Sequence, residues 1–75
     1  MLISPRHSQK NQVIYSPNES AIGDGAGFWS NDLGWVDVLS ATRFSSWEKA
    51  RLNLPMSTGQ DARWVEIGKA LRHYS

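Results

Sequence analysis

Short apolar runs separated by turn-forming residues dominate the first half of the chain, a pattern typical of β-strands. The β-branched and aromatic run at 13–15 is followed by Ser16 and Pro17, and it predicts a first strand. Residues 17–27 contain three glycines and are expected to form a loop. The sequence therefore predicts that a short strand and a long loop open the fold.

Two further apolar runs, at 27–30 and 35–38, flank a predicted turn. Between them lie Asn31, Asp32 and Gly34. The Asn and Asp side chains can hydrogen-bond their own backbone, and glycine tolerates a positive φ. A strand, a turn and a strand within about a dozen residues is the usual size of a β-hairpin. We therefore expect a hairpin over 27–38, with Gly34 at a positive φ.

A serine-to-glutamate spacing marks the start of a helix. Ser45 stands three residues before Glu48, as in a capping box, where the serine caps an amide and the glutamate reaches back to the serine amide. The helix is expected over 46–53, and Pro55 stops it because proline has no amide donor. The residues expected to share its buried face are Trp47, Ala50 and either Arg51 or Leu54.

The last segment fits two structures. Residues 62–67 are typical of a strand, because Val65 is β-branched and Gly68 interrupts the run. We favour a strand that ends at Gly68 and is followed by a short helical or frayed tail. The alternative is one helix, because apolar residues also recur at spacings of three and four: Trp64, Ile67, Leu71 and Tyr74.

Together these elements predict an α+β domain. It is a small antiparallel sheet of three to four strands with one helix packed on a face, in the order β-β-β-α-β. The domain is expected to span 12–68, with a flexible N-terminal segment at 1–11 and a C-terminal tail at 69–75. Such a sheet leaves edges unpaired and one face open. These surfaces are available for docking unless the termini fold back and cover the open face.

The chain is short and has no cysteine. Its 75 residues bury only about 60% of the surface that the unfolded chain exposes, so the core is small. Without cysteine there is no disulfide, no zinc finger and no thiol nucleophile, which fits a reducing compartment. Four tryptophans, two tyrosines and two phenylalanines supply much of the apolar mass, and we expect most of the tryptophans to meet in one core.

Charge is nearly balanced over the whole chain but is unevenly distributed. The formal net charge is +1; residues 1–37 carry two basic and four acidic side chains, and residues 38–75 carry six basic and three acidic ones. So small a net charge predicts no strong attraction to nucleic acid or to a membrane surface. Because no apolar run is long enough for a membrane span or a signal peptide, the sequence predicts a soluble, cytoplasmic protein.

The sequence offers little material for catalysis or metal binding. His7 and His73 stand at opposite ends of the chain, and no residues have a metal-binding spacing. No serine lies in a G-x-S-x-G motif. The glycine-rich run at 23–27 leads into a strand signal at Phe28, so it lacks the helix N-terminus that a phosphate loop needs. We therefore predict no enzyme activity, no cofactor and no metal.

The predicted hairpin and the step into the predicted helix carry a resemblance. Their motifs are W-S-N at 29–31, G-W-V at 34–36 and A-x-x-F at 41–44. This pattern resembles small uncharacterised proteins of bacteria and their phages over roughly residues 13–67. The resemblance implies a compact unit of strands and one helix and an accessory or mobile-element origin. It brings no established activity.

The tryptophans bear most directly on function. Strand alternation turns Trp29 away from Phe28 and Trp35 away from Val36, so both faces of the hairpin are apolar. One helix can hardly cover both faces, and at least one of the two indoles is expected to be partly exposed. Tryptophan and arginine are enriched at protein–protein hot spots. The candidate interaction surface consists of Trp29, Trp35, Arg43 and Arg63.

These features predict a non-enzymatic interaction module, an accessory or phage-derived protein that docks on a host protein. The alternative is a weak single-stranded nucleic-acid binder, in which bases stack on an aromatic-basic face. A homodimer also fits the pattern, because a second copy of the chain would cover the open sheet face.

Overall fold

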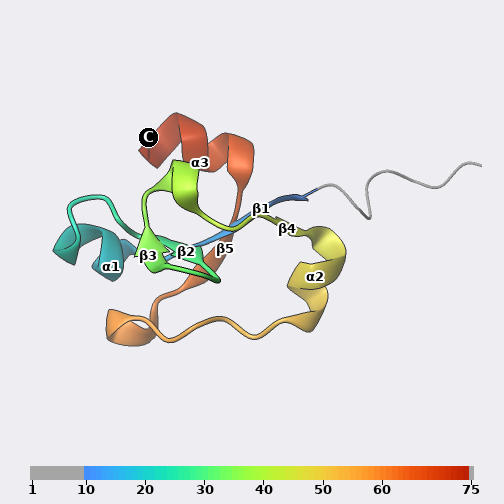
Figure 1. Ribbon diagram of the computed structural model, residues 1–75, viewed down its shortest axis with the longest axis horizontal. Helices are drawn as coiled ribbons and strands as arrows, with labels where there is room; N and C mark the ends of the chain where they lie inside the picture. The colour runs from blue at the N-terminus through green and yellow to red at the C-terminus, as the bar shows by residue number, and fades with distance from the viewer. Residues whose placement is uncertain (1–9, 75) are drawn as a thin grey trace, which may run out of the picture.

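The computed structural model of the chain describes residues 10–74, which form a five-stranded antiparallel sheet with three α-helices (Figure 1). This confirms the predicted α+β class, with five strands in place of three to four. The strands are β1 (Lys10–Tyr15), β2 (Phe28–Ser30), β3 (Gly34–Val36), β4 (Phe44–Ser45) and β5 (Arg63–Glu66). The helices are α1 (Pro17–Ile22), α2 (Ser46–Arg51) and α3 (Ile67–Tyr74), and the 3-10 helices are η2 (Val38–Ser40) and η3 (Thr58–Gln60).

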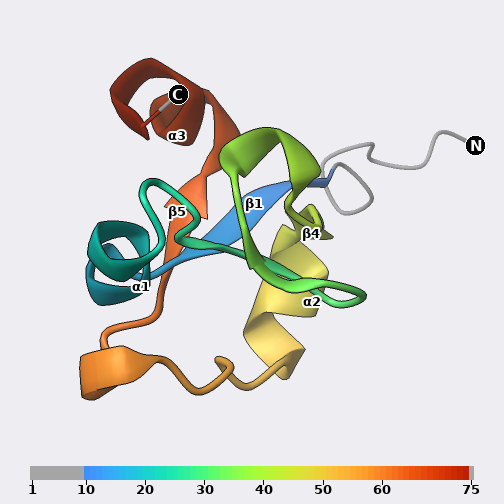
Figure 2. The ribbon, with the colours of Figure 1, turned by 60° about the vertical axis from the view of Figure 1, so that its left-hand side comes forward.

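Strand β1 is the centre of the sheet. Strand β5 pairs along one edge of β1, with Val65 opposite Val13, and Figure 2 shows the two strands side by side. The other edge of β1 is shared, because β4 pairs near its start and β2 pairs near its end, where Phe28 lies opposite Tyr15. Strand β3 then adds to β2.

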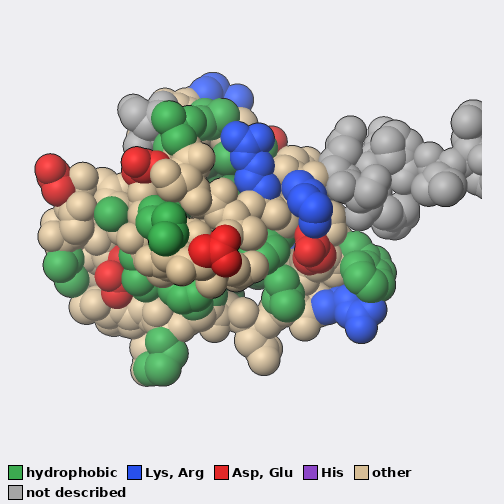
Figure 3. All heavy atoms as spheres, viewed as in Figure 1, with side chains coloured by type: hydrophobic (Ala, Val, Ile, Leu, Met, Phe, Trp, Pro, Cys, Tyr) green, Lys and Arg blue, Asp and Glu red, His purple; other side chains and the backbone are tan. Residues whose placement is uncertain are grey.

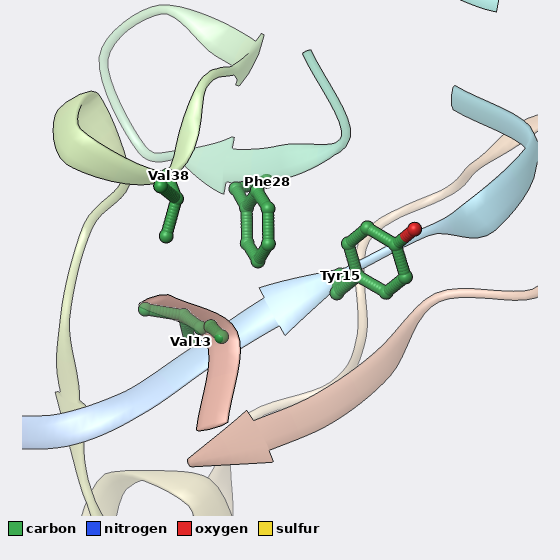
Figure 4. Close-up of a cluster of buried hydrophobic side chains, with 5 residues drawn as sticks. Val13, Tyr15, Phe28 and Val38 are labelled. Atoms are coloured by element: carbon green, nitrogen blue, oxygen red, sulfur yellow. The ribbon is translucent and has the colours of Figure 1, made fainter. Parts of the chain in front are cut away.

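The main core lies on one face of this sheet. Val13 and Tyr15 point to the same side of β1, because alternate residues of a strand share a face. They meet Phe28 and Val38 there (Figure 4), and the ring centroids of Tyr15 and Phe28 lie 4.8 Å apart. Ala70 of α3 completes the cluster and has no exposed surface. Its small side chain lets the helix pack closely against the sheet.

Helix α3, and not α2, supplies the helical cover of this core. Figure 1 shows α3 on one side of the strands and α2 on the other. Helix α2 has no buried residues, and Trp47 is 56% exposed, so the predicted buried face of this helix is wrong. A capping box determines where a helix begins, but distant parts of the chain determine which side packs. The predicted tail at 69–75 is helical up to residue 74, and its Ala70 belongs to the core.

The last segment combines the two structures that its sequence fits. Residues 63–66 form β5, and α3 begins at the next residue, Ile67. This confirms the preferred order of a strand followed by a helical segment, with the boundary one residue before the Gly68 break. Ile67 and Leu71 lie one helical turn apart and pack against the core.

At the N-terminal side the domain also begins earlier than predicted. Lys10 and Asn11 belong to β1, so the boundary at residue 12 is wrong. Strand pairing explains the difference, because Lys10 lies opposite Ser45 of β4, a partner that the sequence does not reveal. The rest of the predicted flexible segment, 1–9, lies outside the described residues.

The predicted loop at 17–27 contains helix α1, so that prediction is wrong for its first half. The Oγ of Ser16 accepts a hydrogen bond from the amide of Glu19 at 3.1 Å and caps the helix. Pro17 stands in the first turn, where a missing amide donor costs little. Serine, proline and glutamate at this spacing are a helix start signal, which the glycines at 23–27 obscure.

The predicted hairpin is confirmed. Trp29 lies opposite Trp35 and Ser30 lies opposite Gly34, and the φ of Gly34 is 85°. The Oγ of Ser30 accepts hydrogen bonds from the amides of Asp32 and Leu33, which holds the turn together. The third strand is shorter than expected, because the chain turns into η2 after Val36.

Replacement of Gly34 by valine is expected to lower the free energy of unfolding by at least about 1 kcal/mol, because a β-branched residue is strained at a positive φ. No atom lies within 4 Å of the position that a Cβ would take at this residue, so strain and not a clash causes the loss. Urea denaturation measures the change. The matched control is Gly34→Asn, since asparagine tolerates this conformation better; equal losses in both variants would contradict the turn geometry.

The predicted start of α2 is also confirmed. The Oγ of Ser45 accepts a hydrogen bond from the amide of Glu48 at 3.1 Å, and the Oε1 of Glu48 accepts one from the amide of Ser45 at 2.8 Å. Lys10 of β1 also binds this carboxylate at 2.7 Å. The capping box therefore joins α2 to the start of β1. The helix ends at Arg51, four residues before Pro55 and two residues earlier than predicted.

Candidate functional site

Two of the predicted surface residues form a pair on the hairpin. The indole rings of Trp29 and Trp35 lie edge to face, with centroids 5.3 Å apart and planes inclined at 70°. The Nε1 of Trp29 donates a hydrogen bond to the Oδ1 of Asn31 at 3.0 Å. Both indoles are half-buried, which confirms that at least one of them is partly exposed.

The structure does not bring the two predicted arginines together with this pair in one patch, because Arg63 lies elsewhere. Arg43 is exposed. The amide of the preceding residue, Thr42, donates a hydrogen bond to the carbonyl oxygen of Trp29 at 2.9 Å, so the backbone next to Arg43 is attached to the hairpin. Arg63 pairs with Tyr15, and its guanidinium lies 5.8 Å from that ring. Tyr15 faces the core, whereas alternation turns Trp29 to the other face. Arg63 is thus separated from the indole pair.

The other two tryptophans also lie outside the main core. The ring of Trp64 contacts Phe44 edge to face at 5.4 Å, on the sheet face opposite the core, and is half-buried. Trp47 is exposed, with the guanidinium of Arg51 4.3 Å from its ring centroid. The expectation that most tryptophans meet in one core is therefore wrong. The spacing of four residues between Trp47 and Arg51 is the one sequence signal for their stacking.

Helix α2 and the segment after it expose a series of large apolar side chains, here called the apolar strip. Its members are Trp47, Leu52, Leu54 and Met56, with exposed fractions between 42% and 84%. Residues 52–56 follow the helix without regular structure, and a hollow of about 260 Å³ lies beside them. Pro55, Ser57, Gln60 and Ala62 complete the lining of this hollow. The sequence prediction missed the strip because it assigned Trp47 to the core.

A second hollow, here called the β5 groove, runs along strand β5 and has a volume of about 570 Å³. Its cationic side chains are Lys49 of α2, Arg63 of β5 and Lys69 of α3, and all three are exposed. The one acidic member is Glu66, whose Oε1 accepts a hydrogen bond from the amide of Lys69 at 3.0 Å. The remaining lining residues are Gln12, Trp64 and Val65.

A polar clamp fastens the segment before β5 to the start of α1. Asp61 accepts hydrogen bonds from the hydroxyl groups of Ser16 and Ser57 and from the amide of Asn18 at 2.9 Å. Glu19 accepts two more from the amide and hydroxyl of Thr58, at 2.8 and 2.9 Å. A serine–aspartate contact needs a histidine to become a nucleophilic triad, and among residues 10–74 the one histidine is His73, in α3. The clamp is therefore a structural link between two distant segments.

The clamp gives stability a specific dependence on pH. The hydrogen bond from Ser16, reinforced by those from Asn18 and Ser57, lowers the pKa of Asp61 below its ordinary value of 3.8. A lowered pKa in the folded state stabilises the fold above about pH 4, and this stabilisation is lost as the pH falls through the folded-state pKa. We expect the melting temperature to fall on acidification and to fall less in Asp61→Asn. An equal fall in both proteins would contradict the role of Asp61.

The comparison with Asp61→Asn is needed because the stabilising contribution of Glu48 is also lost as the pH falls. Its hydrogen bond to Lys10, and then the one from the amide of Ser45, lower the pKa of Glu48. Asp61→Asn removes only the contribution of the clamp, and Glu48→Gln removes only that of the capping box. The melting temperatures of the two variants at acidic pH therefore separate the contribution of Asp61 from that of Glu48.

Within residues 10–74, no group of three or more His, Asp or Glu side chains is arranged to hold a metal ion. Over the same residues, no helix has the length and apolar character needed to cross a membrane. Comparisons with protein-family models, with curated proteins and with solved structures gave no match to this chain.

Proposed function

We propose that this chain is a small, non-enzymatic interaction module that docks on another protein. The observation that carries the proposal is the amount of large apolar surface left in solvent by a domain of this size. Large apolar side chains that stay exposed can be buried by a protein partner. Among the described residues, the exposed large apolar side chains are Ile22, Leu33, Leu39, Trp47, Leu52, Leu54 and Met56.

The apolar strip is the best candidate for the docking site. Tryptophan and arginine are the side chains most enriched at binding hot spots, and Trp47 and Arg51 stack on each other at the start of the strip. The strip continues to Met56, which is 84% exposed. The chain has no cysteine, which fits a module that works in the reducing cytoplasm. An accessory role in bacteria or their phages is part of the proposal.

Single-stranded nucleic-acid binding is the second candidate. Figure 3 shows Lys and Arg side chains gathered toward α2 and α3, and acidic side chains mainly toward α1 and the hairpin. Thr42, the residue before Arg43, donates a backbone hydrogen bond to the carbonyl oxygen of Trp29. The indole pair of Trp29 and Trp35 is half-buried and its rings contact each other edge to face, which leaves little ring surface for a base. This geometry favours a protein partner.

Affinity purification of the tagged chain from its native cells tests the proposal. We expect one or more proteins to be enriched with the wild-type chain and with the control Asn53→Ala, and to be lost with Trp47→Ala. Nuclease treatment before capture distinguishes the second candidate, because nuclease would then abolish the enrichment. If no protein is enriched over an untagged control, the interaction-module proposal fails.

A further inference from the structure

We infer that the outer edge of β5 binds an extended, acidic segment of the partner protein by strand addition. This inference rests on the proposed function and names a site and a class of ligand for it. In strand addition, a peptide pairs its backbone with the free edge of a sheet, and pockets along that edge receive its alternate side chains.

The pairing of β5 leaves one edge open. All four residues of the strand pair with β1, from Gln12 opposite Glu66 to Tyr15 opposite Arg63. Within residues 10–74, no strand pairs with the other edge of β5. Alternate residues of an edge strand direct their amide and carbonyl groups outward, so this edge offers hydrogen-bonding groups to an incoming strand.

The β5 groove adjoins this strand. All four residues of β5 line it, together with Gln12 of β1, Lys49 of α2 and Lys69 of α3. Helix α2 contacts β4 and β1, and α3 follows directly after β5, so neither helix pairs with the outer edge of this strand. Trp64 and Val65 add apolar surface. A volume of about 570 Å³ is sufficient for several side chains of an extended peptide.

The charges of the groove select an acidic ligand. Lys49, Arg63 and Lys69 are exposed, and among the described residues the only salt bridge joins Lys10 to Glu48, outside the groove. The carboxylate of Glu66 is directed to the amide of Lys69 in the first turn of α3. The lining is therefore net positive and open to carboxylates. The chain's own residues 1–9 include Arg6 and no acidic residue, so they lack this complementarity.

Two features favour a peptide over a single nucleic-acid strand. Base stacking needs an open aromatic face, but Trp64 is half-buried and contacts Phe44 edge to face at 5.4 Å. The backbone of β5 presents the alternating donors and acceptors that a strand, and not a sugar–phosphate chain, can match. Lysines also protect sheet edges from unwanted pairing. If Lys49 and Lys69 served only to protect the edge of β5 from pairing, an acidic peptide would not bind.

The test is a titration of the full chain, labelled with ¹⁵N, with a capped eight-residue peptide of alternating glutamate and valine, followed by NMR. We expect saturable shifts of the amides of 63–66 and slower hydrogen exchange at the outward amides of β5. The same peptide with N-methylated backbone amides must lose the binding, because strand addition depends on these donors. A lysine–valine peptide must bind at least about tenfold more weakly.

Two charge-reversal variants locate the site. Lys69→Glu is expected to weaken binding of the glutamate–valine peptide at least about tenfold, whereas Arg43→Glu, the same kind of change outside the groove, leaves most of the affinity. Circular dichroism checks that both variants are folded. Equal loss in the two variants would overturn the site.

Four other outcomes would also overturn the inference. The first is that the glutamate–valine peptide does not bind, and the second is that binding survives N-methylation of the peptide. The third is that an eight-residue oligothymidylate binds more tightly at the same amides. The fourth is that the shifts of these amides depend on protein concentration without peptide, which would identify a second copy of the chain as the occupant. The test is independent of the apolar strip. If the groove variant still captures the native partner but Trp47→Ala does not, the proposed function stands and the β5 inference fails.

Discussion

Replacement of Phe28 by alanine is expected to lower the free energy of unfolding by about 3–5 kcal/mol, the largest effect of any single truncation in this fold. Phe28 is 1% exposed and lies at the centre of the main core, against Tyr15 and Val13 (Figure 4). The core of a domain of this size rarely supplies more than about 3–5 kcal/mol of stability. The variant is therefore expected to be largely unfolded at 37 °C.

Urea denaturation, followed by tryptophan fluorescence, measures this loss. The matched control is Phe28→Leu, which keeps most of the apolar volume and is expected to cost less than the alanine variant. A loss below about 1 kcal/mol in Phe28→Ala would show that the core is centred elsewhere.

Replacement of Gly27 by alanine is expected to cost about 1–3 kcal/mol, the range found for overpacked cores. A methyl group at this position would lie 2.5 Å from the Cβ of Ser20 and 2.8 Å from the carbonyl oxygen of Ser16. The Cβ of Ser20 and the carbonyl oxygen of Ser16 cannot move without the backbone, so α1 or β2 must shift to make room for the methyl group. The loop predicted over 17–27 gives no indication of this close approach.

The matched control makes the same chemical change in α3. A methyl group at Gly68 would meet the end of the Glu66 side chain at 3.0 Å, a flexible group that can move away. Alanine also favours a helix over glycine by about 1 kcal/mol. We expect Gly68→Ala to be neutral or stabilising in thermal unfolding. Equal losses at Gly27 and Gly68 would contradict the close approach of α1 and β2.

Local signals in the sequence predicted the parts of the fold that depend on a few adjacent residues. The hairpin turn needs a residue that tolerates a positive φ, and Gly34 supplies it. The start of α2 needs the Ser45–Glu48 capping box, and both of its hydrogen bonds are present. The start of α1 had an equally local signal at Ser16, but the glycines after it favoured a loop.

The packing of these elements depends on contacts between distant residues, and the sequence did not predict it. Ala70 is an ordinary helical residue until α3 lies on the sheet, where its small size permits close packing. Trp47 has the composition of a core residue, yet α2 turns it to solvent. The candidate site shows the same limit. Of the β5 groove only Arg63 was predicted, because Lys49 and Lys69 come from separate helices.

Isothermal titration of the captured partner against the wild-type chain, Trp47→Ala and Asn53→Ala tests the interaction-module proposal. Trp47 is 56% exposed, so its truncation leaves the fold intact, as an unchanged melting temperature would show. We expect Trp47→Ala to weaken binding by more than about 1 kcal/mol, roughly fivefold, while Asn53→Ala has no effect. Equal affinity of the partner for all three proteins would contradict the proposal.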